Sequence, residues 1–368
     1  MDHFDLIIVG AGIVGAHCAK LATERGCTVA LIEPDVIGGG VTAASMGHLV
    51  AMDDDPAELA LARYSLGLWE QYKGVADAEF SRCGTLWLAA TEHELASVPA
   101  RVQRLAKAGI HAEAVDAAQL RQLEPTLAGD LLGGMRVPGE AVVYPPGICN
   151  WLVARAVAGG ARLLQGRRVV RLREQGVELD DGSHLAGPVL VAAGTASTTL
   201  LPELPMHQRR GHLVITDRYP GTLRHQVLEL GYANSAHGND AVSVAFNVQP
   251  RPTGQLLLGS SREQGVLDGA INPAVLRSML QRAFRFLPGL QSLKAIRVWT
   301  GQRPCTPDGR PYIGAVPGRR GAWVATGHEG LGVATSTGTA QLLLDLIEGR
   351  VPAIDPAPYD PARVIAWA

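Results

Sequence analysis

The first 34 residues hold the pattern that most restricts the fold of this chain. Phe4–Gly10 (FDLIIVG) is a short apolar run ending in glycine, which is typical of a buried parallel strand. Residues 14–26 (VGAHCAKLATERG) predict a helix, and Cys27–Pro34 (CTVALIEP) predicts a second buried strand. Two strands and a helix within about thirty residues form a β-α-β unit. The sequence therefore predicts an α/β fold built on a parallel sheet.

The turn between the first strand and the helix reads G-x-G-x-x-G, from Gly10 to Gly15. We expect Gly10 to make the tight turn, Gly12 to let a pyrophosphate approach the backbone, and Gly15 to let the helix pack on the strand. The phosphate would lie at the helix N-terminus, where free N–H groups favour an anion. Glu33 ends the second strand, where its carboxylate is placed to accept from ribose hydroxyls and to repel a 2′-phosphate. The motif predicts dinucleotide binding and disfavours NADP.

The rest of the chain divides by pattern. A helix is expected over residues 56–72, and residues 81–141 mix one strand with two helices. Another helix, several strands and VLVAAG (Val189–Gly194) follow. From Arg209 to Trp299 alternating residues predict antiparallel strands with one helix at Pro273–Phe286. The C-terminal part returns to a buried strand and a helix. We therefore expect an α/β layer made of three separated pieces, with an antiparallel layer inserted between them.

Composition excludes several classes of function. The formal net charge of the 368 residues is −2 with no basic stripe, so nucleic acid is not an expected partner. Five cysteines without a C-x-x-C pair, and eleven histidines without a paired motif, predict neither a disulfide framework nor a metal site. No basic region precedes the first strand, so we expect no signal peptide, a cytoplasmic protein and at most peripheral membrane association.

Two glycine-rich segments suit a flat ring system. Gly38–Leu49 (GGGVTAASMGHL) is a loop of small residues that either runs close beneath such a ring or is an ordinary flexible loop. Gly327–Gly349 begins with GHEGLG and predicts a turn that opens a helix. A helix N-terminus at that place suits the electron-rich edge of a reduced flavin. For His328 we expect a side chain that caps this helix, with the surrounding backbone carrying the function.

Arg303 lies in Gly301–Gly314 (GQRPCTPDGRPYIG), a segment whose three prolines and glycine predict a stiff loop. Arginines are mostly exposed, so this residue taken alone indicates a surface charge. A stiffly held guanidinium also matches a carboxylate as a planar fork, which would make Arg303 an anion clamp.

The end motifs, together with VLVAAG and GQRPCTPDGRPYIG, resemble the D-amino-acid-oxidase family of FAD-dependent oxidoreductases over nearly the whole chain. The resemblance is nearest to the bacterial branch of glycine oxidase, the hydrogen cyanide synthase flavin subunit, opine oxidase subunits and D-hydroxyproline dehydrogenase. It implies a Rossmann-type FAD-binding domain (1–80, 142–208 and 300–368) with an inserted antiparallel-sheet substrate domain (81–141 and 209–299).

The resemblance also implies residue roles. Arg303 and His48 would serve catalysis, and both would bind the substrate together with Asn247 and Glu329. Arg303 would clamp the substrate carboxylate. The residues implied to hold FAD are Gly10, Gly12, Ile13, Val14, Gly15, Glu33, Thr42, Ala44, Ser45, Met46, Gly47, Val169, Ala193, Gly194, Gly301, Gly327, His328, Gly330, Leu331 and Gly332.

Two positions depart from the family pattern. Some relatives attach FAD through a cysteine where this chain has Gly301, and Cys305 lies displaced in the turn, so we expect non-covalent FAD. Relatives also place a carboxylate-binding tyrosine near Phe246-Asn247, where this chain has none.

The predicted activity is oxidation of a small amino acid to its imine, with D-hydroxyproline or D-proline as the expected substrate. Glycine or sarcosine oxidation and a flavin subunit of a larger opine oxidase or cyanide synthase complex stay open as alternatives. An NAD dehydrogenase would leave the C-terminal glycine-rich helix unexplained. Oxygen or a redox partner subunit would accept the electrons, and a homo-oligomer stays open.

Overall fold

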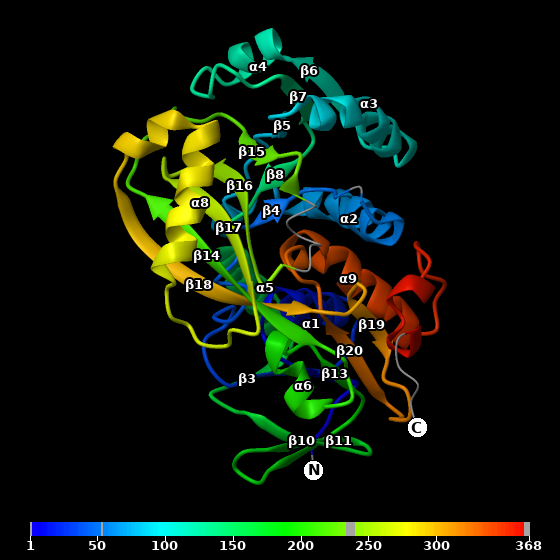
Figure 1. Ribbon diagram of the computed structural model, residues 1–368. Coiled ribbons are helices and arrows are strands. Elements are labelled where there is room, and N and C mark those ends of the chain that lie inside the picture. Colours follow the sequence, from blue (N-terminus) through cyan, green and yellow to red (C-terminus); the bar gives the residue numbers. More distant parts are fainter. Residues whose placement is uncertain (1, 53, 233–239, 364–368) are drawn as a thin grey trace.

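Two large sheets organise the computed structural model, which describes residues 2–52, 54–232 and 240–363 (Figure 1). The first sheet has six strands in the order β19-β20-β13-β2-β3-β9, parallel except for the β19–β20 pair. Its strands are β2 (Leu6–Val9), β3 (Val29–Glu33), β9 (Arg162–Gln165), β13 (Val189–Val191), β19 (Tyr312–Ala315) and β20 (Ala322–Thr326). All four residues of β2 are buried, as the unbroken apolar run predicts.

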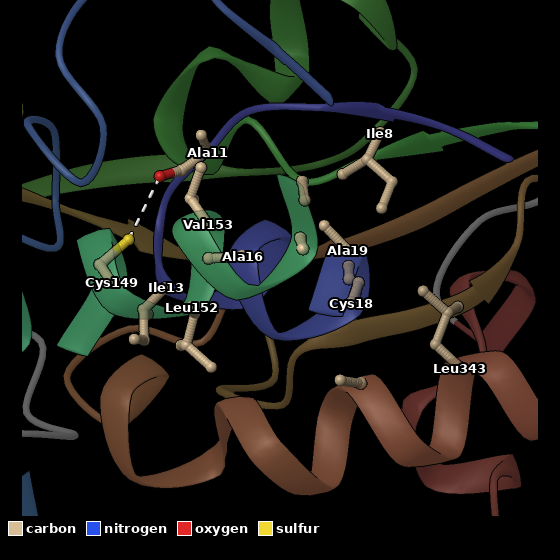
Figure 2. Close-up of a cluster of buried hydrophobic side chains, with 14 of the residues drawn as sticks. Ile8, Ala11, Ile13, Ala16, Cys18, Ala19, Cys149, Leu152, Val153 and Leu343 are labelled. Atoms are coloured by element: carbon tan, nitrogen blue, oxygen red, sulfur yellow. Dashed lines mark hydrogen bonds between the residues drawn. The ribbon is translucent and has the colours of Figure 1, made fainter. Parts of the chain in front are cut away.

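Helices cover one face of this sheet. Helix α1 (Ile13–Glu24) packs against both α5 (Pro145–Ala158) and α9 (Gly332–Ile347), as Figure 2 shows. Small side chains such as Ala16 and Ala19, each with no exposed surface, let the helices approach closely. Helix α2 (Pro56–Trp69) lies against α9 and continues as the 3₁₀ turn η1 (Glu70–Tyr72). The expected helix over 56–72 therefore has a tighter last turn.

The opposite face of the first sheet carries a four-stranded sheet, at the bottom of Figure 1. Val169, Val177 and Leu185 of this smaller sheet share a buried cluster with Ile7 and Ile32 of the first sheet. The strands of the smaller sheet are β1 (Asp2–His3), β10 (Val169–Arg173), β11 (Gly176–Leu179) and β12 (His184–Ala186).

The second large sheet has eight strands in the order β18-β14-β17-β16-β15-β5-β7-β6. These are β5 (Thr85–Ala89), β6 (Glu113–Asp116), β7 (Gly133–Val137), β14 (His207–Thr216), β15 (Gln226–Glu229), β16 (Val242–Pro250), β17 (Leu256–Gln264) and β18 (Ala295–Cys305). The helices α3 (Glu92–Lys107), α4 (Ala117–Leu123) and α8 (Pro273–Phe286) pack on it. A separate two-residue pair joins β4 (His48–Leu49) to β8 (Ala141–Val142). The single turn α6 (Ser197–Leu200) contacts β10 of the four-stranded sheet.

The structure differs from the sequence-based expectations in the second large sheet. The inserted layer is a mixed sheet rather than an antiparallel one, because β5 and β15 pair in parallel across a long connection. Arg303 lies within strand β18, not on a loop, and Pro304 is tolerated there because β18 is the edge strand. Strands β14 and β18 run past the predicted domain limits at 208 and 300, so the division into two domains stays a prediction.

Within the described residues no helix combines the length and apolar character needed to cross a bilayer. The same ranges hold no group of three or more histidine, cysteine, aspartate or glutamate side chains arranged for a metal ion.

Candidate functional site

A cavity of about 680 Å³ lies where the two large sheets meet, a size within the range of small-molecule and cofactor sites. Residues of β2, β3 and β20, the segment directly after β13, and the N-terminal turns of α1 and α9 form one part of its wall. Residues of β14, β17 and β18 form another part, so the cavity is bounded by both sheets. The two strands β14 and β18 reach from the second sheet toward the first (Figure 1).

The G-x-G-x-x-G turn lines one end of the cavity with Gly10, Gly12, Ile13 and Val14. Gly10 has φ +104°, and a Cβ there would lie 2.6 Å from the Ala192 carbonyl oxygen, so no other residue fits this turn. Gly15 lies outside the wall. A Cβ on Gly15 would be 2.0 Å from the Gly10 carbonyl oxygen, so this glycine serves helix–strand packing, the role predicted for it.

The N-terminus of α1 has a cap supplied from elsewhere in the chain. Gly12 at the N-cap has no side chain, and the Ile13 N–H donates to Thr42 Oγ1 at 3.0 Å. At α9 the N-cap residue Leu331 makes no side-chain cap, which leaves backbone N–H groups free beside cavity-lining Gly332. Two helix N-termini therefore face one cavity, an arrangement that favours an anionic or electron-rich ligand.

Glu33 lies in the cavity wall, where backbone groups hold its carboxylate. Its Oε2 accepts from the Ala11 N–H at 2.9 Å and its Oε1 from the Asp35 N–H at 3.0 Å. A carboxylate has about four acceptor positions, so Glu33 keeps capacity for hydroxyl donors. Val169, Ala193 and Gly194, which the sequence predicts to contact FAD, line the same cavity. Sequence reasoning missed Arg168, which also lines it.

The small-residue loop lines the cavity with Thr42, Ala44, Ser45, Met46 and Gly47. It touches strand β18 at one point, since a Cβ on Gly301 would lie 2.4 Å from the Ala44 Cβ. That position therefore has no space for a side chain such as cysteine. Cys305 is buried at the end of β18, 3.5 Å from the Arg303 carbonyl oxygen.

The turn before α9 contributes His328, Glu329, Gly330 and Gly332 to the wall, but Gly327 and Leu331 do not line it. Gly327 has φ +79° and turns away from the cavity against Thr306, while Leu331 packs in an apolar cluster. His328 does not cap the N-terminus of α9 as expected, because its Nε2 meets Thr339 Oγ1 inside that helix at 3.0 Å. Burial lowers the pKa of His328 to about 4, so the ring is neutral at pH 7.

Arg303 reaches the cavity from strand β18 and lies over Gly211 of the neighbouring strand β14. A Cβ on Gly211 would be 2.4 Å from the Arg303 Nη1, so the missing side chain makes room for the guanidinium. Nη1 donates to the Ser261 carbonyl oxygen at 2.9 Å, and no ion pair joins Arg303 to a carboxylate of the described ranges. Burial and the nearby Arg262 lower the pKa of Arg303, as expected for a cation without its counter-ion.

His48 lies in the cavity wall, where a hydrogen bond fixes the tautomer of its ring. Gln226 donates its Nε2 to the Ala141 carbonyl oxygen at 3.2 Å, which directs Gln226 Oε1 toward the His48 Nδ1 at 2.6 Å. That Nδ1 therefore carries the proton, and Nε2 keeps its lone pair. Nε2 is buried without a hydrogen-bond partner in the part of the chain described. Burial lowers the pKa of His48 to about 4, which keeps the ring neutral.

Residues 5–346 match the protein-family model described as "FAD dependent oxidoreductase". The chain belongs to this family. Glycine oxidase of Pseudomonas putida is 30% identical over 381 residues, which cover 97% of this chain and 98% of the relative. A crystal structure of glycine oxidase from Geobacillus kaustophilus superposes with a TM-score of 0.88 at 27% identity and covers 100% of both chains. Hydrogen cyanide synthase subunit HcnC of Pseudomonas aeruginosa is 25% identical over 98% of this chain and 96% of its own length.

The family, the fold class and FAD as the cofactor of this oxidoreductase are thus as the sequence predicted. The cavity suits FAD on the chemistry of its walls. The glycine turn and the N-terminus of α1 suit the pyrophosphate, and the N-terminus of α9 suits the flavin ring. Glu33 suits the ribose. The roles of the single residues stay predictions.

The cavity of the flavoprotein also contains polar residues that sequence reasoning missed. Tyr232 and Ser260 line it together with Arg303, and the Tyr232 hydroxyl lies 3.4 Å from Ser260 Oγ. Asn247, predicted to bind substrate, does not line the cavity and donates its Nδ2 to Ser260 Oγ at 3.4 Å. No local pattern marks Tyr232, because it lies outside the strands, three residues after β15, and comes near Arg303 only through the pairing of distant strands.

Proposed function

We propose that this flavoprotein oxidises a small α-amino acid to its imine and binds the substrate carboxylate through Arg303. The observation that carries the proposal is a partly buried guanidinium in the FAD cavity, over a glycine and without an acidic partner in the described ranges. An arginine keeps its positive charge at any physiological pH, and its planar fork matches a carboxylate. A substrate carboxylate would supply the missing counter-ion.

The chain's own residues would bind and orient the substrate. Tyr232 and Ser260 have hydroxyls in the wall near Arg303 and are the proposed second contact for the carboxylate, in place of the tyrosine absent near Asn247. Glu33, the glycine turn and the two helix N-termini are proposed to hold FAD. When bound, the flavin supplies the two-electron acceptor, so no acid–base triad is required of the protein.

For the substrate we propose D-hydroxyproline or D-proline. The supporting observation is the neutral ring of His48 in the cavity wall, whose Nε2 keeps a lone pair. A buried acceptor is costly when it stays unpaired, so a ligand with a donor at that point is favoured. A ring hydroxyl or the secondary amine of a cyclic amino acid is such a donor.

Glycine or sarcosine is the second candidate, because relatives that match nearly the whole chain are named glycine oxidase. A flavin subunit of a larger complex is a third, supported by the relative named as a hydrogen cyanide synthase subunit. In that case oxygen would be replaced by a protein as the electron acceptor.

An anaerobic panel read by flavin absorbance tests the proposal. D-proline, both D-hydroxyproline epimers, glycine and sarcosine are mixed with the holoenzyme, each beside its carboxamide. We expect bleaching by a cyclic D-amino acid and slow or no bleaching by the amides. Fastest bleaching by glycine would select the second candidate, and no bleaching by any amine would select the third.

Arg303→Ala and Arg303→Lys complete the test. We expect kcat/KM for the acid to fall at least about tenfold with Arg303→Ala, equivalent to about 1.4 kcal/mol, and less with Arg303→Lys. The amides should respond little to either change. Arg297→Ala is the control, since Arg297 lies on the same strand with an exposed side chain. Equal losses for acid and amide would rule out the carboxylate clamp.

A further inference from the structure

Arg262 of strand β17 is a second buried guanidinium beside the cavity, with 3% of its surface exposed. It does not belong to the cavity wall, but it contacts two residues that do. Its guanidinium lies 5.0 Å from the centre of the Tyr232 ring, and its Nη2 donates to the Tyr232 hydroxyl oxygen at 3.3 Å. Its Nε donates to Glu329 Oε1 at 3.2 Å. One side chain thus connects strand β17 to two separate parts of the wall.

The contact with Arg262 determines how Tyr232 uses its hydroxyl group. A guanidinium has five N–H donors and no acceptor, so the Tyr232 oxygen must accept from it. The phenol proton is then left for a different acceptor, either Ser260 Oγ at 3.4 Å or an anion in the cavity. Burial alone would raise the pKa of Tyr232, but the charges of Arg262 and Arg303 outweigh it and the pKa is lower than usual. A phenol of this kind is a stronger hydrogen-bond donor.

The backbone conformation of Glu329 gives independent evidence that its contact with Arg262 is structurally important. It has φ +47°, a left-handed conformation that costs a residue with a Cβ about 1 kcal/mol or more. Its carboxylate meets Arg262 directly, and Arg209 Nη1 is 4.0 Å away. Arg262 therefore holds the turn before α9 as well as the tyrosine.

We infer that Arg262 is a positioning residue, which holds Tyr232 with its O–H free to donate to the substrate carboxylate bound by Arg303. The inference rests on the proposed function, because it needs an anion at Arg303. Arg262 itself does not touch the substrate. It acts through the orientation of the Tyr232 ring and the direction of its hydroxyl proton.

A double-mutant cycle on the FAD-loaded protein tests this inference. The probes are furan-2-carboxylate and furan-2-carboxamide, and binding is read from the perturbation of flavin absorbance. We expect Arg262→Gln to weaken binding of the acid about tenfold and to change binding of the amide less than about threefold. In a Tyr232→Phe background, Arg262→Gln should cost less than about twofold, because the hydroxyl through which Arg262 acts is absent. Arg262→Lys keeps the charge and N–H donors on one nitrogen but loses the planar fork, so it should recover part of the loss.

Arg282→Gln is the matched control. Arg282 pairs with buried Glu229 and lies 5.3 Å from the centre of the Phe286 ring, so it makes the same kinds of contact outside the cavity wall. It should lower the melting temperature and leave acid binding unchanged. If Arg262→Gln does not retain flavin, Arg262→Lys takes its place in the same cycle.

The outcomes separate the two proposals. A parent protein that binds acid and amide equally overturns the proposed function, and this inference with it. A parent that prefers the acid, with equal losses from the Arg262 variant in both backgrounds, overturns the inference alone. Unchanged acid binding in the Arg262 variant does the same.

Discussion

At the scale of single residues, the cavity depends on the absence of a side chain as much as on those present. Gly211 pairs directly with Gly301 across β14 and β18, and the Arg303 guanidinium lies where a Gly211 side chain would be. Gly211 has no positive φ, so its backbone conformation does not require glycine. The space that the Arg303 guanidinium occupies explains why position 211 is a glycine.

Gly211→Ala should therefore displace Arg303 while leaving the fold intact. The far end of an arginine is flexible and can move, so we expect a change in the free energy of unfolding within about 1 kcal/mol. Binding of a carboxylate should weaken by about tenfold, because the bidentate geometry is lost. Flavin-perturbation titration and thermal melting measure the two effects. Full carboxylate affinity in this variant would contradict the packing of Arg303 over Gly211.

A second residue-scale prediction concerns the attachment of FAD. Gly301 cannot hold a covalent link, and burial raises the pKa of the Cys305 thiol to about 12, so little thiolate exists at pH 7. We expect acid precipitation to release all of the flavin into the supernatant. Yellow colour in the washed pellet would show a covalent bond instead.

At the scale of elements, strand β18 joins the two parts of the cavity. Pairing with β14 places Arg303 in the wall, and the close approach of Gly301 to Ala44 brings the same strand against the Thr42–Gly47 loop. Carbon atoms in ordinary contact are about 3.5–4.0 Å apart, so 2.4 Å between two Cβ atoms is not tolerated.

Gly301→Ala should thus move either the loop or the strand and reduce FAD retention. Overpacking of this kind costs about 1–3 kcal/mol of stability, and here the displaced segments line the cofactor cavity. Ala44→Gly in the same chain restores the space, so the double variant should retain more flavin than Gly301→Ala alone. The ratio of flavin to protein absorbance after gel filtration measures both. Equal flavin content in the parent and in Gly301→Ala would contradict the close approach of Gly301 to Ala44.

At the scale of the whole molecule, the packing of α2 against α9 brings acidic groups together near the cavity. Glu58 in the first turn of α2 lies close to Glu329, Asp55 and Asp54. Burial and, to a smaller extent, these like charges together raise the pKa of Glu58 to about 8. The folded protein therefore binds a proton at Glu58 that the unfolded chain releases above about pH 4.5.

The stability contributed by the neutral Glu58 is present below about pH 4.5 and is lost as pH rises toward 8. Glu58→Gln imitates the neutral acid, so its melting temperature should exceed that of the parent by an amount that grows from pH 5 to pH 8, reaching at least about 2 °C. Glu92→Gln, an exposed residue in the first turn of α3, should show no such growth. Buried histidines titrate equally in all three proteins and cancel. A difference independent of pH would refute the assignment.

Features that depend on neighbours along the chain could be predicted from the amino-acid sequence. The β-α-β unit, the roles of Gly10 and Gly15 and the position of Glu33 follow from spacings within 34 residues, where a strand, a turn and a helix leave few alternatives. The bounds of α8 also follow from local signals, since Asn272 caps a helix that starts at Pro273. Motifs of this kind, at both ends of the chain and between them, were sufficient to predict the family.

Which distant residues share the cavity could not be predicted, because it depends on how the strands pair. Arg303 meets Gly211 because of the register between β14 and β18, and Tyr232 lies beside it through the order of strands in the second sheet. His48 became a fixed acceptor through Gln226 and the Ala141 carbonyl, which are far from it in sequence. Strand register and amide orientation arise from packing between distant segments, so no local pattern encodes them.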